Sequence, residues 1–455
     1  MSDDLRQSWR ALGALCIGLF TTLVDQSLIA VAVPHIRDNL GASVNQVVWV
    51  QAIYLLMFAA PLLVTGRLGD RFGQRNVYLV GMAIFIVAAL ACALVPSIEW
   101  LIAMRAVQGL GASLLNPQPL SIINRIFPKD RRGAAMGVWS AVAGSSGLVG
   151  PVIGGLIVGS LGWRPVFLLY VPLGLVSLFL VARWVPTLPT GARRIDLISV
   201  VASLVAVFAV VFTLQQGPEE GWPGWLWGVL AVGVLAFVVF LRLQRTATSR
   251  GTEALVPFEL FAHRNFALGV AAVATLGFTV YAVNLPIMLY LQTGAGLSSE
   301  VAGLMLVPSS VISILLAPVV GRLADKLHPG VISRIGFGSM IAAMALFAVL
   351  MRGGTSPGWL LVPMLLLGAA NAMCWSSNSA ISMRQLPPHL VGAGSGVYNT
   401  SRQVGAAVGM AALGAVMQVG VASTDFATAM GNTMLLPIAM LVVGFVAVSR
   451  FRSDL

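Results

Sequence analysis

The sequence predicts an all-α protein that crosses a lipid bilayer many times and contains a duplicated bundle of helices. Of its 455 residues, 58% are hydrophobic and only 9% are charged, whereas soluble domains carry about 25% charged residues. Apolar runs of membrane-spanning length follow one another along most of the chain. A charged turn between two such runs occurs twice, as GRLGDRFGQR at 66–75 and as GRLADK at 321–326. These observations predict a polytopic membrane protein built from two related units.

The membrane spans follow from length, because a helix needs about 20 apolar residues to cross the hydrocarbon core. Counting such runs gives about fourteen predicted helices, joined by short loops apart from 183–195 and 242–264. No soluble domain is expected between them. In chain order, the predicted helices cover 11–34, 45–66, 76–96, 99–123, 134–159, 164–185, 195–215, 223–242, 265–292, 300–324, 331–351, 358–382, 393–420 and 430–449.

A second repeat supports the duplication. GAAMGVW at 133–139 opens the fifth predicted helix and GAGSGVY at 392–398 opens the thirteenth, at nearly the same offset as the two charged turns. Helices one to six and nine to fourteen are therefore expected to be related units, with seven and eight as an insert. The predicted division is one six-helix bundle at 1–185, two inserted helices with a linker at 186–264, and a second six-helix bundle at 265–455. Parallel six-helix repeats are typical of transporters that hold substrate near the bilayer midplane.

The distribution of charge predicts the orientation in the membrane. Basic residues crowd the predicted loops on one side, whereas the other side has only Arg37, Arg164 and Arg352. Because positively charged loops stay in the cytoplasm, both termini are expected to be cytoplasmic, in a protein of the bacterial inner membrane. The net charge of +11 forms neither a patch nor a tail, so no nucleic-acid partner is expected. The expected partners are lipid, protons and small amphipathic substrates. The protein is expected to be a monomer.

Three charged residues lie inside apolar runs, namely Asp25, Arg105 and Arg402. A charge at a helix centre costs about 2.5–3.5 kcal/mol on insertion scales, so it is kept only where it is paired or functional. With a rise of ~1.5 Å per residue, Asp25 lies roughly 12 Å and Arg105 roughly 9 Å below the outer surface. We therefore predict that Asp25 binds a proton and that Arg105 stabilises its charged form. The alternative is a static ion pair that only orients two helices.

A second polar group is predicted on the twelfth and thirteenth helices. Arg402 lies roughly 14 Å from the cytoplasmic surface, and four amide side chains share its depth, namely Asn371, Asn378, Asn399 and Gln403. These side chains either line a polar wall of the substrate cavity or form interhelical hydrogen bonds worth about 1 kcal/mol or less each. No acid of the second half is placed to pair with Arg402, which favours the cavity for that residue.

Aromatic and methionine side chains are further candidates for the cavity wall, because flexible, polarizable surfaces suit varied apolar ligands. Most such residues in a membrane protein face lipid or a neighbouring helix, which is the alternative for each of them. Together with two polar residues of the fourth helix, the candidates are Trp49, Tyr54, Gln108, Asn116, Tyr281 and Trp375.

Enzymatic functions find little support in the sequence. The four histidines lie at helix ends or in loops without a carboxylate or cysteine at metal-ligand spacing. Cys16, Cys92 and Cys374 are widely separated within apolar runs, which predicts neither disulfides nor a metal site. No glycine-rich phosphate loop with a Lys-Ser or Lys-Thr pair is present, so ATP hydrolysis is not expected. The sequence predicts no cofactor and no metal, and the energy source is expected to be an ion gradient.

Four segments together resemble a known transporter family. They are the loop 66–75, the fourth-helix segment 101–112 with Arg105, Gln108, Gly109 and Gly111, the fifth-helix positions Gly147, Gly150, Pro151, Gly154 and Gly155, and LVDQS at 23–27 running to AVP at 32–34. In this order and on these helices, they resemble the motifs of the major facilitator superfamily, and within it the fourteen-helix drug:proton antiporters. The resemblance covers nearly the whole chain.

The resemblance implies roles for two of these segments. It associates the fifth-helix glycines and Pro151 with export, where the bend at the seam between the halves seals the cavity against leak; dense packing alone is a compatible alternative. The loop 66–75 is expected to act as a conformational gate, with Gly66 permitting contact with the second half near the eleventh helix and Asp70 holding the outward-open state. A basic loop that only anchors the membrane is the alternative. The predicted gate residues are Gly66, Asp70, Arg71, Gly73, Arg75 and Asp325.

The chain also departs from the family pattern. Ser146 stands where a glycine is usual, the downstream turn continues as LHP at 327–329, and the tenth helix carries no acid at 301–324, which argues against a preference for dications. The expected function is a proton-coupled secondary exporter, a drug:proton antiporter that extrudes small amphipathic or hydrophobic compounds by alternating access. The alternatives are a dedicated exporter of one metabolite or lipid and, from another class, a transport-inactive membrane sensor or scaffold.

Overall fold

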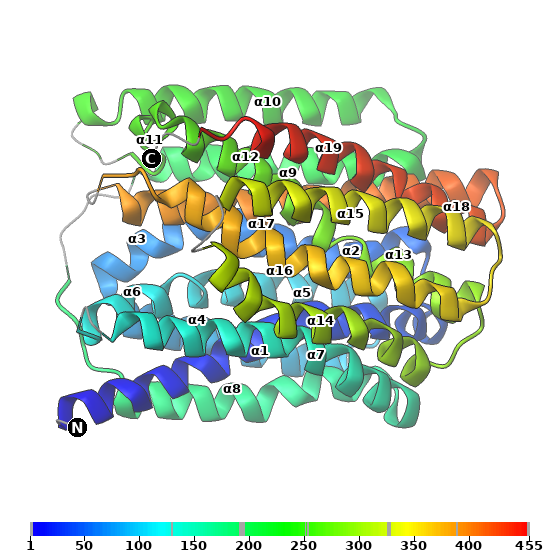
Figure 1. Cartoon of the computed structure of the whole chain (residues 1–455), viewed down its shortest axis with the longest axis horizontal. Helices are drawn as coiled ribbons and strands as arrows, with labels where there is room; N and C mark the ends of the chain where they lie inside the picture. The colour runs from blue at the N-terminus through cyan, green and yellow to red at the C-terminus, as the bar shows by residue number, and fades with distance from the viewer. Residues whose placement is uncertain are drawn as a thin grey trace.

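In the computed structural model, the long helices run roughly side by side (Figure 1). The structure describes residues 3–128, 131–190, 196–250, 252, 254–324, 329–387 and 390–452, and every regular element in these ranges is a helix. In that part of the chain, 13 helices are long and apolar enough to cross a membrane, or up to 14 if one bent pair of shorter helices is counted as a single span. The protein is therefore a multi-pass membrane protein, as its composition predicts.

The first eight helices pack largely against one another. Their bounds are α1 (Asp3–Leu40), α2 (Val44–Ala59), α3 (Leu62–Phe72), α4 (Gln74–Leu94), α5 (Ile98–Leu115), α6 (Gln118–Ile126), α7 (Arg132–Leu161) and α8 (Arg164–Trp184). The closest pairs are α1 with α7 and α8, α4 with α5 and α8, and α2 with α5. We refer to these eight helices as the first half.

Two of the predicted spans are interrupted at proline. The predicted helix 45–66 is α2 followed by α3, with a bend of 50° between them, because Pro61 cannot donate the backbone hydrogen bond that a continuous helix needs. The predicted helix 99–123 is α5 followed by α6, which separate at Asn116 and Pro117. The bend after α2 lays α3 against α4 and α5 and also against a helix of the second half, α17 (Val391–Ser423).

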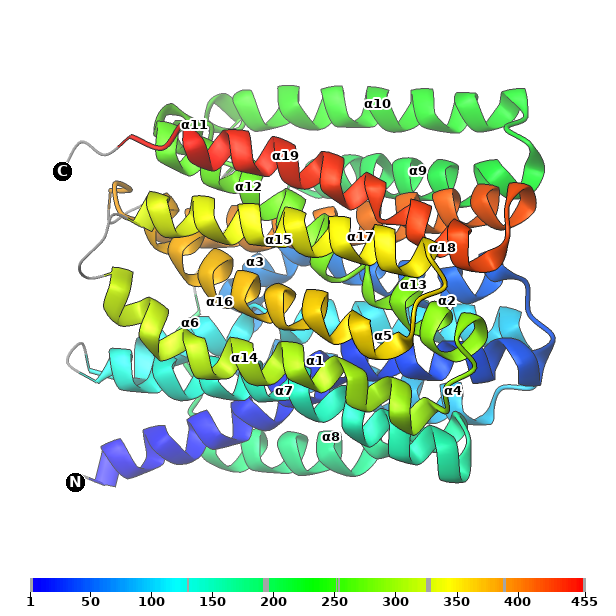
Figure 2. The same cartoon turned by 45° about the vertical axis from the view of Figure 1, so that its right-hand side comes forward.

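The two inserted helices are α9 (Leu197–Glu220) and α10 (Gly224–Arg245). Asp196 caps α9 by accepting hydrogen bonds from the backbone N–H groups of Ile198 and Ser199. α9 packs against α10, against α2 of the first half and against α17 (Val391–Ser423). α10 lies at the edge of the helix array in both views (Figures 1 and 2).

The remaining helices pack together as the second half. The closest pairs join α15 with α16 and α19, α12 with α17 and α19, and α14 with α16. The bounds are η1 (Thr248–Arg250), α11 (Glu259–Ala262), α12 (Arg264–Val280), α13 (Asn284–Leu289), the π-helical turn η2 (Tyr290–Gly294), α14 (Ser299–Ala324), α15 (Pro329–Arg352), η3 (Pro357–Leu360), α16 (Leu361–Met383), α17, α18 (Phe426–Thr433) and α19 (Leu435–Ser449).

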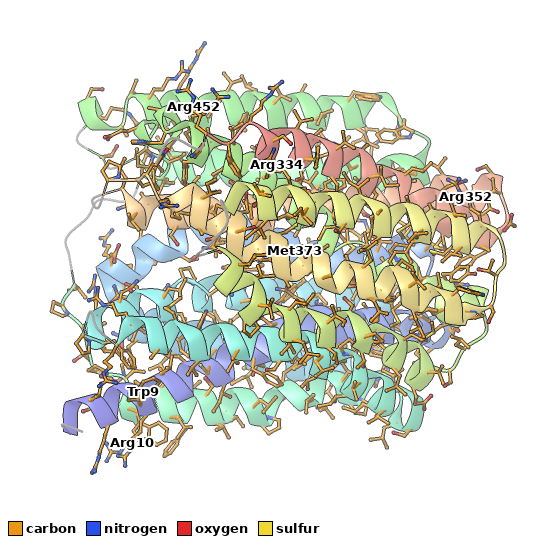
Figure 3. All side chains as sticks on the ribbon, viewed as in Figure 1. Trp9, Arg10, Arg334, Arg352, Met373 and Arg452 are labelled. Atoms are coloured by element: carbon orange, nitrogen blue, oxygen red, sulfur yellow. The ribbon has the colours of Figure 1, made fainter. Side chains whose placement is uncertain are left out.

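The two halves meet mainly along two helix pairs, α7 with α14 and α2 with α17. Both chain termini lie at the same end of the helix array (Figures 1 and 2). Arg10 and Arg452 mark this terminal end in Figure 3, and Arg352 marks the far end.

Candidate functional site

An ion pair between α1 and α5 is buried inside the first half. The Nη1 atom of Arg105 is 2.8 Å from Oδ1 and 2.9 Å from Oδ2 of Asp25, and 0% of Asp25 and 1% of Arg105 are exposed. Nη1 also donates to Oε1 of Gln108 at 2.7 Å, and Nε donates to the Val50 carbonyl oxygen at 3.2 Å. The structure thus brings together the two charged residues for which the sequence predicts a similar depth in the membrane. Their charges compensate each other, and the pair connects α1, α2 and α5.

Aromatic rings enclose this pair. The guanidinium carbon of Arg105 lies 4.1 Å from the ring centre of Tyr54 and 5.9 Å from that of Phe167, a contact worth about 2 kcal/mol where the cation is desolvated. The buried hydroxyls of Tyr54 and Tyr170 make no hydrogen bond of ordinary geometry among the described residues, but both lie within electrostatic reach of the Asp25 carboxylate. Buried polar groups without partners are uncommon and call for a specific explanation. Tyr54 was predicted from the sequence as a cavity residue. Phe167 and Tyr170 lie in the apolar run of α8, where the sequence alone does not distinguish them from aromatic residues that face lipid.

The polar residues of α16 and α17 divide into two groups. Asn378 donates to the Gly269 carbonyl at 3.1 Å and to the Tyr398 hydroxyl at 2.8 Å, so it bonds α16 to α12 and α17. Asn399 donates to the Ser395 carbonyl oxygen of its own helix at 3.0 Å. Hydrogen bonds between and within helices therefore satisfy the N–H groups of both amides. The Oδ1 atom of Asn378 has no partner among the described residues.

Arg402, Gln403 and Asn371 form the second group. Each has a buried polar atom without a hydrogen-bond partner in the described ranges, namely Nε of Arg402, Oε1 of Gln403 and Oδ1 of Asn371. The guanidinium carbon of Arg402 lies 5.8 Å from the ring centre of Trp375. Gln403 follows Arg402 on α17, and Asn371 lies one helical turn before Trp375 on the same face of α16. We call these four residues the Arg402 cluster.

The other predicted cavity residues have different neighbours. Trp49 donates from Nε1 to Oε1 of Gln216 at 3.3 Å, so it packs against the inserted helix α9 rather than against the second half. Asn116 and Tyr281 are partly buried and stand at the ends of α5 and α12. In the described part of the chain, no group of three or more His, Cys, Asp or Glu side chains could hold a metal ion.

The glycines of α7 let two helices approach it closely. A Cβ at Gly150 would collide with the Ser27 side chain of α1, and a Cβ at Gly154 would lie 3.0 Å from Leu28 Cγ. On the side of the second half, a Cβ at Gly155 would lie 2.8 Å from the Ser299 carbonyl oxygen of α14. α7 therefore connects the helix that carries Asp25 to the second half, which close approach of small residues permits in membranes.

The seam between α7 and α14 is tight at the far end and looser toward the terminal end. Glycines make it tight at the far end, because a Cβ at Gly303 of α14 would collide with the Pro151 carbonyl oxygen. In the middle, Ser310 donates to the Gly147 carbonyl oxygen at 2.8 Å. A Cβ at Gly144 would meet Ile314 at 3.6 Å, and one at Gly137 would meet no described atom within 4 Å.

Two further contacts close the halves at the far end. Gln292 donates to the Val31 carbonyl oxygen at 3.1 Å, and Gln418 donates to Oδ1 of Asn45 at 3.1 Å. The same Asn45 bonds to Gln215, Gln216 and Glu219 of α9, so the insert also joins this closed end. Sequence analysis did not predict this network, because polar residues near span ends are indistinguishable from loop residues.

The acid of the charged turn at 66–75 has its polar partners in the first half, whereas Arg67 donates to the Ala254 carbonyl oxygen of the linker at 3.2 Å. Asp70 lies 3.6 Å from Arg125 of α6 and accepts a hydrogen bond from Gln74 at 3.1 Å. A Cβ at Gly66 would have only Pro117 within 4 Å, so the expected contact of Gly66 with the second half near the eleventh helix is not found. The bend at Pro61 turns Gly66 toward Pro117, whereas α3 itself packs against α4, α5 and, in the second half, the thirteenth helix α17.

The other predicted gate residues also have local roles. Arg75 donates to the Ala182 carbonyl oxygen of α8, and Arg71 lies over the ring of Phe72 at 5.3 Å. Gly73 separates α3 from α4 with a φ of 89°, a left-handed conformation that favours glycine. Asp325 lies outside the described residues.

Residues 15–410 match the family model of the Major Facilitator Superfamily. The chain belongs to this superfamily. Members of the superfamily are transporters, and a solved structure of an auto-inhibited peptide transporter of the POT family has the same fold, with a TM-score of 0.72 at 15% identity over 98% of this chain and 97% of the other.

Three curated relatives indicate the kind of transporter. An uncharacterized MFS-type transporter of Mycobacterium tuberculosis is 39% identical over 98% of this chain and 81% of its own length. The multidrug resistance protein Stp of the same species is 31% identical over 90% and 75%. The tetracenomycin C resistance and export protein of Streptomyces glaucescens is 32% identical over 90% and 76%. Relatives of this superfamily member are thus named as multidrug or antibiotic resistance exporters.

Proposed function

We propose that this protein is a proton-coupled exporter of the fourteen-helix drug:proton antiporter branch, which extrudes small amphipathic compounds by alternating access. The observation that carries the proposal is the buried pair of Asp25 and Arg105 in a chain whose relatives are named for resistance and export. Intramembrane ionisable residues mark ion pathways and proton relays far more often than they serve packing.

The geometry supports a proton step at Asp25. A proton on either carboxylate oxygen neutralises Asp25 and releases Arg105 Nη1 from the ion pair. Gln108 and the ring of Tyr54 still hold the guanidinium, so Arg105 remains stabilised while α1 is freed. Deprotonation restores the pair, because a nearby guanidinium favours the charged carboxylate.

The position of Asp25 on α1 links this step to the seam between the halves. Two residues further along α1, the Ser27 hydroxyl lies 3.4 Å from the Ser146 carbonyl oxygen of α7. α7 packs on α14 through Gly155 and Ser299. A change of charge at Asp25 therefore acts on the helix pair along which the halves must rock.

The closed far end and looser terminal end support an inward-facing conformation, provided that the termini are cytoplasmic in the bacterial inner membrane. In this proposal the rocking units are 1–185 and 265–455, and 186–264 is the insert. A dedicated exporter of one compound is the second candidate, because one relative is named for a single antibiotic.

The test uses inverted membrane vesicles energised to an acidic interior, with proton release followed by an acridine dye as candidate compounds are added. Wild-type protein should release protons with its substrates, and Asp25→Asn should abolish the release while still inserting. Asp38→Asn is the matched control, because Asp38 lies on the same helix with 79% of its side chain exposed. Normal substrate-driven release by Asp25→Asn would remove Asp25 from the mechanism.

Resistance of cells to a panel of toxic compounds then separates the two candidates. Protection against several unrelated classes supports a multidrug exporter, and protection against one class supports a dedicated one. Loss of all protection in Asp25→Asn, with normal protein levels, ties the resistance to the proton step.

A further inference from the structure

The Arg402 cluster holds a cation whose charge no described residue compensates. Among the described residues, the ion pairs join Arg37 to Asp38, Arg105 to Asp25, Arg125 to Asp70 and Arg250 to Asp196, and none includes Arg402. Its Nε atom is buried and has no hydrogen-bond acceptor in these ranges. A charge at such depth in a membrane protein is retained where it is paired or used, so an acceptor for Arg402 is expected from outside the protein.

The charges of the two halves make this site positive. Asp25 and Arg105 cancel each other in the first half. The acids that the structure describes on α14 and α18 or next to them are Glu300 and Asp425, which lie at the far end of the helices. Arg402 therefore leaves one net positive charge at membrane depth, which opposes a cationic ligand and attracts an anionic one.

The neighbours of Arg402 come from one face of α16. A Cβ at Gly336 of α15 would lie 2.7 Å from Cys374 Sγ and 2.9 Å from Met373 Cβ, so Cys374 and Met373 face α15 (Figure 3 labels Met373). At about 100° per residue, Trp375 points away from α15 and meets Arg402 of α17. Asn371 is four residues before Trp375 and therefore shares its face of α16.

The chemistry of these groups selects a ligand class. A guanidinium binds a carboxylate or a similar oxyanion through two parallel N–H donors. The ring of Trp375 offers an apolar face for an aromatic ligand next to that anion. The buried atoms of Asn371 and Gln403 without partners are oxygens, so they are acceptors for N–H or O–H groups elsewhere on the ligand and not for its acidic group. The cluster thus matches a planar aromatic compound that carries an acidic group.

We propose that the Arg402 cluster binds the acidic group of the exported compound, so that the substrates of this protein are aromatic anions. The inference rests on the proposed export function and adds the chemical class of the substrate. It also states a consequence for energetics: an anion that leaves a cell with a negative interior moves with the membrane potential, so the potential drives its export in addition to the proton.

The test is a binding measurement that needs no gradient, with protein in nanodiscs of phosphatidylcholine. The probes are the anion 8-anilinonaphthalene-1-sulfonate and the neutral N-phenyl-1-naphthylamine, which share an aromatic skeleton and differ by the sulfonate. Arg402→Gln should raise the Kd of the anionic probe tenfold or more and change the Kd of the neutral probe less than twofold. Arg402→Lys keeps the charge without the planar fork and should give an intermediate Kd for the anion.

Two controls fix the interpretation. Arg352→Gln removes an exposed arginine at the far end of α15 and should leave both Kd values unchanged. Unchanged binding of the neutral probe shows that Arg402→Gln is folded, and if that variant does not fold, Arg402→Lys must still weaken the anion selectively.

Equal weakening of both probes, or no effect of Arg402→Gln on the anion, would overturn the proposal. An anionic lipid headgroup shares the chemistry, so the titration is repeated with one third phosphatidylglycerol. Because a negatively charged bilayer also repels the anionic probe, the quantity compared is the ratio of its Kd values for Arg402→Gln and wild type in each bilayer. An unchanged ratio supports the substrate, and a ratio that falls to about one assigns the cluster to lipid and overturns the proposal. Charge-selective binding without proton release in vesicles would refute only the exporter, and proton release by neutral compounds without charge selectivity would refute only this inference.

Discussion

Arg105 and Arg402 are the same residue type inside the membrane, yet their surroundings differ in kind. Arg105 has a carboxylate at 2.8 Å, an amide and a backbone carbonyl as acceptors, and an aromatic ring at 4.1 Å. Arg402 has an aromatic ring at 5.8 Å and an unpartnered Nε. The first arginine is built into the protein, whereas the second is left available. This difference favours the proposal that the first half binds the proton and the second half binds the substrate.

The largest expected effect is on stability when each arginine is removed. Arg105→Gln leaves Asp25 as an uncompensated buried charge and should cost about 3–5 kcal/mol. Arg402→Gln removes an unpaired cation and should change stability by less than about 1 kcal/mol in either direction. Thermal unfolding of the purified variants in detergent measures the contrast.

The double variant Asp25→Asn with Arg105→Gln is the control for that contrast. It should recover most of the loss, because neither charge is then unpaired. If Arg402→Gln destabilised the protein as much as Arg105→Gln, Arg402 would have a strong internal partner and the comparison would fail.

The second prediction concerns the seam between α7 and α14, where the half that holds Arg105 meets the half that holds Arg402. Gly155→Val places side-chain atoms against the Ser299 carbonyl oxygen, and such overpacking costs about 1–3 kcal/mol. The closed far end should therefore open. Spin labels at Asn39→Cys and Val301→Cys would report a longer distance between α1 and α14.

Gly137→Val is the matched change in the same helix, because a Cβ there meets no described atom within 4 Å. It should leave the distance distribution of the labels unchanged. A shift caused by Gly137→Val, or no shift caused by Gly155→Val, would show that the far-end contacts of α7 do not set the conformation.

The aromatic partners of the two arginines give the third prediction. Tyr54→Leu removes a ring 4.1 Å from a fully buried guanidinium and should cost about 2 kcal/mol, whereas Trp375→Leu at 5.8 Å should cost about 0.5–1 kcal/mol. Thermal unfolding compares them, with Trp359→Leu as the control, since Trp359 is exposed. An equal loss for Tyr54→Leu and Trp375→Leu would mean that burial of the rings, not the arginines, dominates.

Sequence alone predicted the helices and the meeting of Asp25 with Arg105, because apolar length and helical rise fix the spans and the depth of each charge. It did not predict the break after α2, since an apolar run hides the effect of Pro61 until neighbouring helices are placed. The predicted contact of Gly66 with the second half was wrong for the same reason, because the break changes the side toward which Gly66 points. The sequence also did not reveal the partners of Trp49 and Asn45 on α9, because the insert has no counterpart in the duplicated pattern. The sequence therefore predicted helix spans and the depth of charges, but not the contacts between segments that are distant in the chain.

The smallest expected effect belongs to an arginine outside the membrane-spanning segments. Arg250 lies 2.9 Å from Asp196, with 33% of the arginine side chain exposed. Partial burial raises the pKa of Asp196, but hydrogen bonds from Ser199 and the contact with Arg250 outweigh it, and the pKa lies below its ordinary value of 3.8. A carboxylate with a lowered pKa stabilises the fold above that ordinary value and loses this contribution as the pH falls through the lowered one.

Asp196→Asn keeps a good helix cap and removes only the charge, so it should cost about 0.2–1 kcal/mol at neutral pH. The difference from wild type should shrink as the pH falls through the lowered pKa of Asp196, because the wild-type carboxylate then becomes protonated. Thermal unfolding of both proteins at neutral pH and near pH 3, at low salt, measures it. A loss that stayed constant with pH would come from the cap rather than from the ion pair. A loss as large as that of Arg105→Gln would mean that burial does not determine how much an arginine ion pair contributes to the stability of this protein.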